Sequence, residues 1–373
     1  MRILLFDWYS GGHHEGYLAA FTRALVEQHT VIAAAPPDGA TAAMEAGAEP
    51  LPLESSFPPI DAKRRFSRER RAALRAEVDL LLRATSTAQP DHTVHLFADA
   101  ALRALVRRPI GAPLSVLLFR PRGHIPAFGT ADSRREAMLG LAYDAILQAW
   151  RRRPDAHAVL TLDPLAAGAW SRRRGAPVYA IPEPAPAVPL PEPRRRQGIV
   201  LFGALSARKG LHYLADALEH DGQGVKLVLA GAVAPSFASS LDSVGARLRA
   251  AGVDVESRVW YHDEAEFLEV LAGGRAAVLP YVGHVGMSRV LVEAASVGTP
   301  VVAHAEGLLG YLVKTRGLGI AVDCRNAAAL AAAVREISDP HATGRYADAL
   351  RRFAAEHSAE HFAAAVREPF DAT

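Results

Sequence analysis

The residues with the clearest chemical potential are charged side chains at junctions between expected strands and helices. The segment "GALSARKG", 203–210, places Arg208 and Lys209 soon after an apolar run, and "HVGMSRVLVEAASVGTPVV", 284–302, places Glu293 within a helical stretch. Two cations beside the positive end of a helix suit a diphosphate, because the free N–H groups there also attract anions. These junctions predict a site for a phosphorylated ligand.

A second group of polar residues follows the first apolar run of the chain. Gly11 and Gly12 come first, and His13 and His14 follow them directly. Glycines at such a position let a phosphate or sugar approach the backbone closely. Adjacent histidines point in different directions, and no carboxylate or histidine stands at ligand spacing, so we expect no metal site. We expect one histidine to lie beside an acceptor, with a structural cap as the alternative.

A third junction, "FRPRGH" at 119–124, follows another apolar run. Arg120, Arg122 and His124 could bind an anionic or hydroxyl-rich acceptor, and a surface loop rich in arginine is the alternative. Asp99 stands at a further junction, where we expect it to cap a helix.

Several well-known motifs are absent. The sequence has no G-x-x-x-x-G-K-[ST], H-E-x-x-H or G-x-S-x-G motif, and no G-x-G-x-x-G between a strand and a helix. This disfavours an ATPase, a zinc hydrolase or a serine hydrolase of familiar type.

The elements that position these residues alternate along the chain. Apolar runs such as 2–6 and 276–280 predict buried parallel strands, and stretches with helical periodicity separate them. A proline-rich stretch, 180–197, cannot be a helix or a central strand. We therefore predict two doubly wound α/β domains facing each other, joined by a linker. The predicted boundaries are residues 1–182, the linker 183–197, residues 198–345, and terminal helices 346–373 that return to the first domain.

The composition of the chain limits its possible partners and its cellular location. The 373 residues carry a formal net charge of +2, which gives no general argument for nucleic acid as a partner. A single cysteine excludes a disulfide within the chain, and neither a signal peptide nor a membrane span is expected. We expect a cytoplasmic protein. The basic run 63–71 predicts either the solvated face of a helix or contact with a membrane surface or an anionic acceptor, so a place at the inner membrane surface stays open.

The glycine pair, the Lys209-Gly210 pair and the run from Gly286 to "GTPVV" together resemble the retaining glycosyltransferases of family 4, which have the GT-B fold of two Rossmann-like domains facing a central cleft. The resemblance implies that Glu293 holds the ribose of a nucleotide and that Lys209 binds its diphosphate. It places further donor-site residues at Gly11, Gly12, Arg208, His284, Gly286, Met287, Ser288 and Arg289.

Two positions depart from the family pattern. Position 285 is Val where the family has its first Glu, and position 204 is Ala where it has Arg. Neighbours such as Arg208, His284 or Ser288 could substitute, the donor sugar could be unusual, or catalysis could be lost. We favour an active enzyme with altered donor recognition, because Lys209, Glu293 and "GTPVV" persist.

The resemblance implies sugar transfer from a nucleoside-diphosphate sugar to a small-molecule or lipid-linked acceptor, with retention of anomeric configuration and without a metal cofactor. Lys209 and Arg208 would stabilise the leaving diphosphate, and Arg120 or His124 would face the acceptor. His13, His14 and Arg122 complete the expected acceptor site. The alternatives are a related epimerase, a pseudo-glycosyltransferase, or a protein that binds a nucleotide sugar without chemistry.

Overall fold

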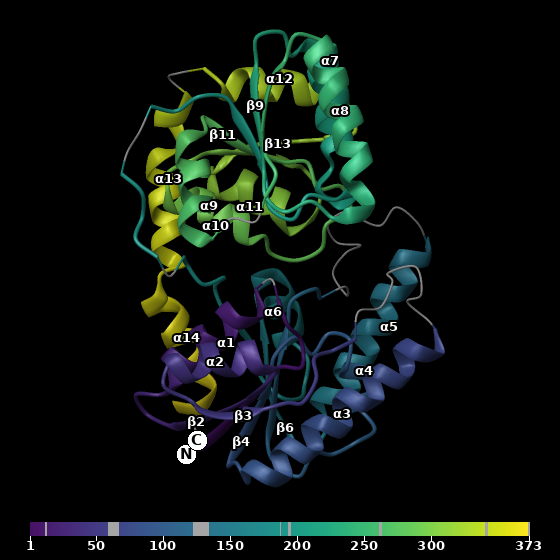
Figure 1. The fold of residues 1–373 in the computed structure, drawn as a ribbon. Helices are drawn as coiled ribbons and strands as arrows, with labels where there is room; N and C mark the ends of the chain where they lie inside the picture. The colour runs from purple at the N-terminus through teal and green to yellow at the C-terminus, as the bar shows by residue number, and fades with distance from the viewer. Residues whose placement is uncertain are drawn as a thin grey trace. The chain divides into compact units, whose positions relative to one another are not determined.

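The protein is described by a computed structural model, which covers residues 1–11, 13–58, 67–121, 134–186, 188–192, 195–260, 263–339 and 342–371. The chain divides into two compact units, each an α/β domain (Figure 1). Unit 1 holds the described residues of 1–126, 133–184 and 359–373, and unit 2 those of 185–358. The chain changes unit between Ser358 and Ala359, whereas the sequence placed that change at 345/346.

Unit 1 is built on a parallel sheet of seven strands, whose spatial order is β3-β2-β1-β4-β5-β6-β7. The strands are β1 (Arg2–Phe6), β2 (Thr30–Ala35), β3 (Glu49–Pro52), β4 (His92–His95), β5 (Leu114–Leu118), β6 (Ala156–Thr161) and β7 (Val178–Ala180). The helices are α1 (His14–Leu25), α2 (Pro37–Glu45), α3 (Arg68–Ala88), α4 (Leu102–Leu105), α5 (Arg134–Arg151), α6 (Pro164–Ser171) and α14 (Ala359–Asp371). Figure 1 shows α1, α2 and α14 on one face of the sheet and α3, α4 and α5 on the other.

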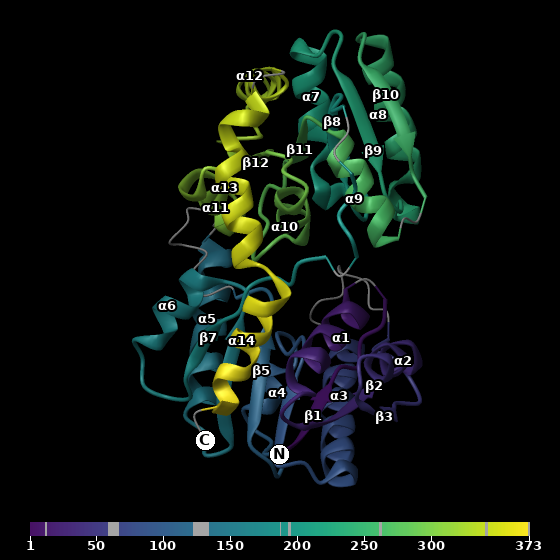
Figure 2. The same cartoon turned by 90° about the vertical axis from the view of Figure 1, so that its left-hand side faces the viewer.

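Unit 2 has a parallel sheet of six strands in the order β10-β9-β8-β11-β12-β13. Its strands are β8 (Ile199–Phe202), β9 (Lys226–Ala230), β10 (Asp254–Arg258), β11 (Ala276–Leu279), β12 (Val301–His304) and β13 (Gly319–Val322). Its helices are η3 (Ala207–Lys209), α7 (Leu211–Asp221), η4 (Pro235–Phe237), α8 (Ala238–Ala250), α9 (Glu264–Gly273), α10 (Arg289–Ser296), α11 (Gly307–Arg316), α12 (Ala327–Ile337) and α13 (Ala342–Glu356). Figures 1 and 2 show α7, α8 and α12 on one face of the sheet and α9, α10 and α11 on the other.

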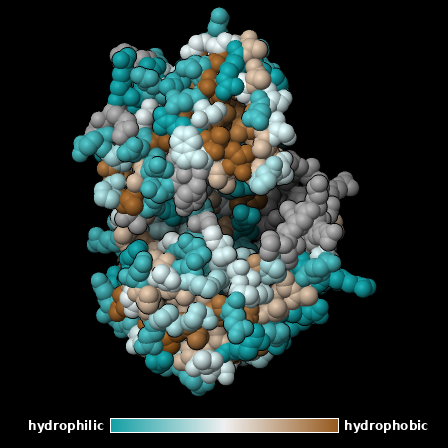
Figure 3. Space-filling view, viewed as in Figure 1, coloured by the Kyte–Doolittle hydropathy of each residue, from teal (hydrophilic) through white to brown (hydrophobic). Residues whose placement is uncertain are grey.

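The central strands are apolar because both faces of each sheet are covered. The residues of β8 and β11 are all buried, as continuous apolar runs in a parallel sheet predict. Hydrophilic side chains dominate the outer surface in Figure 3, although apolar ones gather over part of unit 2. Between β7 and β8 the described residues form neither helix nor strand, in keeping with the proline-rich composition of that stretch.

The strand order fixes where a ligand can bind. In each sheet the order reverses beside the first strand of the unit, between β1 and β4 in unit 1 and between β8 and β11 in unit 2. The loops at the carboxyl ends of these two strands diverge and leave a crevice, which is where open α/β sheets bind ligands. Most of the residues predicted to carry chemistry follow β1, β5, β8 or β11.

Candidate functional site

In unit 2, Lys209 lies between β8 and α7, in a short turn of 3-10 helix. The sequence placed Lys209 at the start of the helix, but α7 begins at Leu211 and Gly210 separates the two elements. Gly210 has φ +68°, and a Cβ there would lie 2.0 Å from the carbonyl oxygen of Pro280. Only glycine fits where this turn meets the end of β11, and the neighbouring Lys209 side chain is buried.

Lys209 and Arg208 have different surroundings. Arg208 is exposed, whereas Lys209 is only 6% exposed. The Lys209 Nζ donates a hydrogen bond to the Tyr281 hydroxyl at 2.7 Å and lies 4.4 Å from the centre of that ring. The pKa of Lys209 is lowered to about 7, mainly by burial and also by the nearby Arg208 charge, while Glu293 opposes the shift.

Gly203, at the end of β8, leaves the space that Lys209 fills. A Cβ at Gly203 would lie 2.9 Å from the Lys209 Nζ. The next residue, Ala204, which replaces the arginine of the resembled family, is exposed. Lys209 is the buried basic residue of this loop, and position 204 carries no charge beside it.

Glu293 is buried on α10, which follows β11. Lys209 follows β8, the neighbouring strand in the sheet. The Glu293 Oε1 accepts a hydrogen bond from the Arg289 Nε at 2.9 Å, and Arg289 also bonds to Glu264 at the start of α9. Burial raises the pKa of Glu293, and the Arg289 charge opposes that rise. Arg289, which the sequence placed among the ligands of the donor, thus binds two carboxylates of its own unit.

The loop before α10 contains the other predicted donor residues. His284 Nε2 lies 3.3 Å from the carbonyl oxygen of Met287, and Gly286 has φ +97°. Ser288 is buried at the N-cap of α10 and makes no capping hydrogen bond there. Val285 is partly buried, so an apolar side chain stands where the resembled family has a carboxylate.

Sequence reasoning missed Tyr281 and Glu264. Tyr281 is the second residue after β11, which makes it part of the crevice loop, and that position was the available signal. Glu264 gave no local signal, because its partner Arg289 is 25 residues further along the chain.

In unit 1, Asp7 follows β1 and holds one of the two predicted histidines. The His14 Nδ1 lies 2.8 Å from Asp7 Oδ2, and Asp7 is almost completely buried. Burial raises the pKa of Asp7, and its bond to His14 opposes that rise. His13 precedes α1 without a side-chain capping bond, and Gly11 is exposed with φ +75°. Gly12 lies outside the described residues.

Aromatic rings surround His14. The Tyr9 ring stacks on the imidazole at 5.0 Å between centroids, and the Phe97 ring lies 3.7 Å away on a tilted plane. Phe97 has φ +57°, which is unusual for a residue with a bulky side chain. Such backbone strain at the end of β4 is typical of binding and catalytic sites.

The sequence predicted that Asp99 caps a helix, but this prediction was wrong. Asp99 instead joins the ends of β4 and β5. Its carboxylate accepts hydrogen bonds from the backbone N–H groups of Phe119 and Arg120 at 2.9 and 2.8 Å. This fixes the Arg120 backbone while the side chain is exposed. Arg122 and His124, which were predicted with Arg120, lie outside the described residues.

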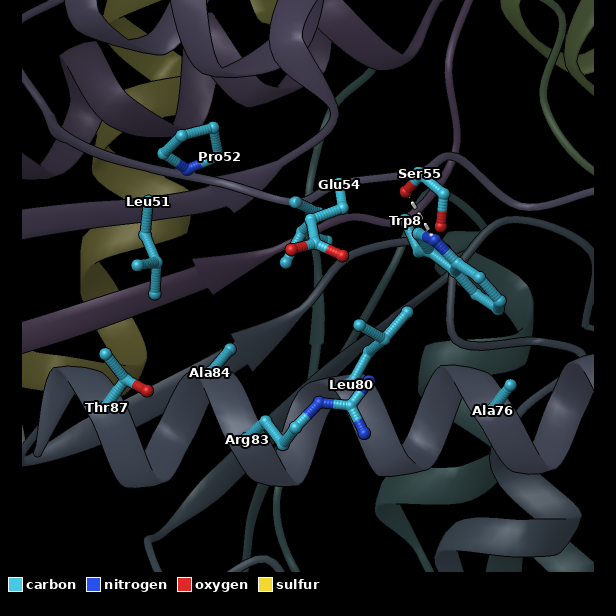
Figure 4. A pocket seen from close by; sticks show the side chains of 11 residues that line it. Trp8, Leu51, Pro52, Glu54, Ser55, Ala76, Leu80, Arg83, Ala84 and Thr87 are labelled. Atoms are coloured by element: carbon cyan, nitrogen blue, oxygen red, sulfur yellow. Dashed lines mark hydrogen bonds between the residues drawn. The ribbon is translucent and has the colours of Figure 1, made fainter.

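A separate pocket of about 530 Å³ opens between β3 and α3 in unit 1 (Figure 4). The Trp8 indole closes one end and donates a hydrogen bond to the carbonyl oxygen of Ser55 at 2.6 Å. Apolar side chains such as Leu80 line the pocket, and Glu54 and Arg83 add charge. None of the residues predicted for the acceptor lines it.

Other predicted features can be checked against the described residues. There, no three His, Cys, Asp or Glu side chains gather as metal ligands. None of the described helices is both long and apolar enough to cross a bilayer. Of the basic run 63–71, residues 63–66 lie outside the described chain, Ser67 caps α3, and Arg68 and Arg71 are exposed.

Known proteins resemble the chain in two ways. Residues 196–339, within unit 2, match a family model described as "Glycosyl transferases group 1". The whole chain superimposes on sucrose-phosphate synthase (tll1590) from Thermosynechococcus elongatus with a TM-score of 0.73, covering 100% of this chain and 99% of that one at 17% identity. The chain has the GT-B fold.

Other solved structures agree with this assignment. Anabaena Alr3699/HepE in complex with UDP has a TM-score of 0.72 at 18% identity, with 100% of both chains covered. A glycosyltransferase from Rickettsia africae has a TM-score of 0.67 at 12% identity, covering 100% of this chain and 99% of that one. No curated protein sequence matches the chain. The predicted fold class is therefore confirmed.

Proposed function

We propose that the protein is a glycosyltransferase that moves a sugar from a nucleoside-diphosphate sugar to a small-molecule or lipid-linked acceptor. The observation that carries this proposal is a buried lysine at the switch point of unit 2, with Glu293 buried on the helix that follows the neighbouring strand. A lysine beside diverging loops is suited to a diphosphate, and a carboxylate is suited to the hydroxyls of a ribose. The matched family segment, 196–339, contains both residues.

The donor side of the reaction follows from the charges in unit 2. When the bond between sugar and diphosphate breaks, negative charge grows on the leaving phosphate, and Lys209 and Arg208 would stabilise it. We infer that the reaction needs no metal and retains the anomeric configuration, as the resembled family does. HepE binds UDP and UDP-glucose in its structures, so a uridine nucleotide is the first donor to test.

The acceptor side is assigned to unit 1. There Asp7 orients His14, and the other ring nitrogen of His14 is left to meet an acceptor hydroxyl. His13 and the exposed Arg120 lie on the loops that follow β1 and β5. Exposed arginines at the start of α3, Arg68 and Arg71, would suit an anionic membrane surface if the acceptor is lipid-linked.

A second function is supported by particular residues. Val285 and Ala204 remove two charged ligands of the resembled family, and Glu293 is already bonded to Arg289. These features favour a protein that binds a nucleotide sugar without transferring it, or a relative such as an epimerase that acts without an acceptor.

A thermal-shift screen against UDP, GDP, TDP, ADP and their sugar conjugates tests the proposal. A ligand that binds the folded state raises the melting temperature, and at a concentration 100 times its Kd the stabilisation is about 2.7 kcal/mol. We expect a selective rise with one base. No rise with any of the four nucleotides would remove the nucleotide site from unit 2.

A further inference from the structure

The amine of Lys209 is buried, and no described residue forms an ion pair with it. Its hydrogen bond goes to the uncharged hydroxyl of Tyr281. An ammonium group that is removed from water without a paired anion is unstable, and a lysine relieves this cost by losing its proton.

The charged groups around Lys209 do not supply the missing anion. Arg208 on the same turn is a second cation, which disfavours charge on Lys209. On α10, the Glu293 carboxylate favours charge on Lys209, but it already accepts a hydrogen bond from Arg289. Arg289 is bonded in turn to Glu264 on α9, so these three side chains largely satisfy one another.

Tyr281 is also kept uncharged. Burial raises the pKa of its hydroxyl above the ordinary value, so it stays a phenol at physiological pH. A phenol can accept the bond from the Lys209 Nζ but cannot neutralise an ammonium as a carboxylate would. The centre of the Tyr281 ring lies 4.4 Å from the Lys209 Nζ, and the absence of a side chain at Gly203 leaves space for the amine.

We propose that donor binding protonates Lys209: the amine rests without charge against Tyr281 in the free protein and becomes an ammonium ion on the bound diphosphate. The proposal rests on the function proposed above. The proton comes from solvent, and no covalent bond other than the new N–H forms. Tyr281 is the positioning residue, because it holds the amine at the site before the anion arrives.

The pH dependence follows from the direction of the change. In the free protein the pKa of Lys209 is about 7, and two phosphate charges beside it would raise this pKa in the complex. At pH values below the pKa of Lys209 in the free protein, the amine is already charged. The titration of Lys209 then does not alter nucleotide affinity. Between the free and the bound values each rise of one pH unit weakens binding about tenfold, because one proton must be taken up.

Calorimetry of UDP binding in buffers with different ionisation enthalpies counts the protons. At pH 8 the nucleotide phosphates are fully ionised, so their own titration adds little. We expect the wild type to take up about one proton per UDP bound. The control is Lys209→Arg, whose guanidinium is always charged and should take up none. GDP, TDP and ADP are used in turn if UDP does not bind.

A second variant keeps the test decisive if Lys209→Arg does not fold. Tyr281→Phe removes the hydroxyl but keeps the ring, so the free amine loses its hydrogen-bond partner and its pKa falls further. The pH at which affinity begins to fall should therefore move lower than in the wild type. Binding without proton uptake at pH 8, or equal uptake in Lys209→Arg, would overturn this inference and leave the proposed function standing. Failure to bind all four nucleotides would overturn both.

Discussion

Glu293 shows what the sequence can and cannot reveal about a single residue. The small-residue run after it and the "GTPVV" strand predicted a helical carboxylate, and Glu293 is buried on α10. Its pairing with Arg289 at i,i+4 was open to prediction from spacing. The second bond of Arg289, to Glu264, was not, because it joins two helices that only the fold brings together.

Removal of the Glu293 carboxylate tests its assignment to the ribose. Because Arg289 keeps Glu264 as a partner, we expect Glu293→Ala to fold. Nucleotide affinity should fall by about 1–3 kcal/mol, the scale of a hydrogen bond to a charged group. Calorimetry is the measurement, and Glu269→Ala, which removes an exposed carboxylate from α9, is the control. Unchanged affinity in a folded Glu293→Ala protein would take Glu293 out of the site.

At the scale of elements, the central strands were predictable and the edges were not. Apolar runs marked β1, β8 and β11 because these strands are buried on both faces. The edge strand β3 has the sequence Glu-Pro-Leu-Pro and was missed, since prolines disfavour a central strand but are tolerated at an edge. The strand β10, also at an edge, occupies the stretch Asp254–Arg258, where polar residues leave no apolar run to mark it.

The turn that carries Lys209 makes a prediction at the same scale. Gly210 and Gly224 both have positive φ, of +68° and +76°, but a Cβ would strike the Pro280 carbonyl only at Gly210. Gly224→Ala should cost about 1–2 kcal/mol of stability, from backbone strain alone. Gly210→Ala should cost more, about 2–5 kcal/mol, because steric overlap is added to that strain.

Urea unfolding of the two glycine variants distinguishes these costs, with the wild type as reference. Equal shifts of the unfolding midpoint would contradict the close approach of the η3 turn to the end of β11. The comparison needs no ligand, so it tests how Lys209 is positioned independently of the proposed function.

At the scale of the whole molecule, alternating strands and helices predicted two doubly wound domains, and the GT-B fold confirms that class. The terminal helix α14 packs in unit 1, where the Phe362 ring contacts Phe21 edge to face. The partners of the chemical residues were harder to predict. Tyr281 is 72 residues from Lys209 in the chain, and only the pairing of β8 with β11 in the sheet brings the two residues together.

The measurement that tests the central claim most directly is product analysis by proton NMR. The purified protein is incubated with the sugar conjugate of the nucleotide that stabilises it and with a panel of hydroxylated acceptors. We predict a new glycoside whose anomeric coupling matches that of the donor, together with release of the nucleoside diphosphate. A glycoside of opposite configuration would contradict retention. Bound donor that yields neither glycoside nor free nucleotide would contradict glycosyl transfer itself.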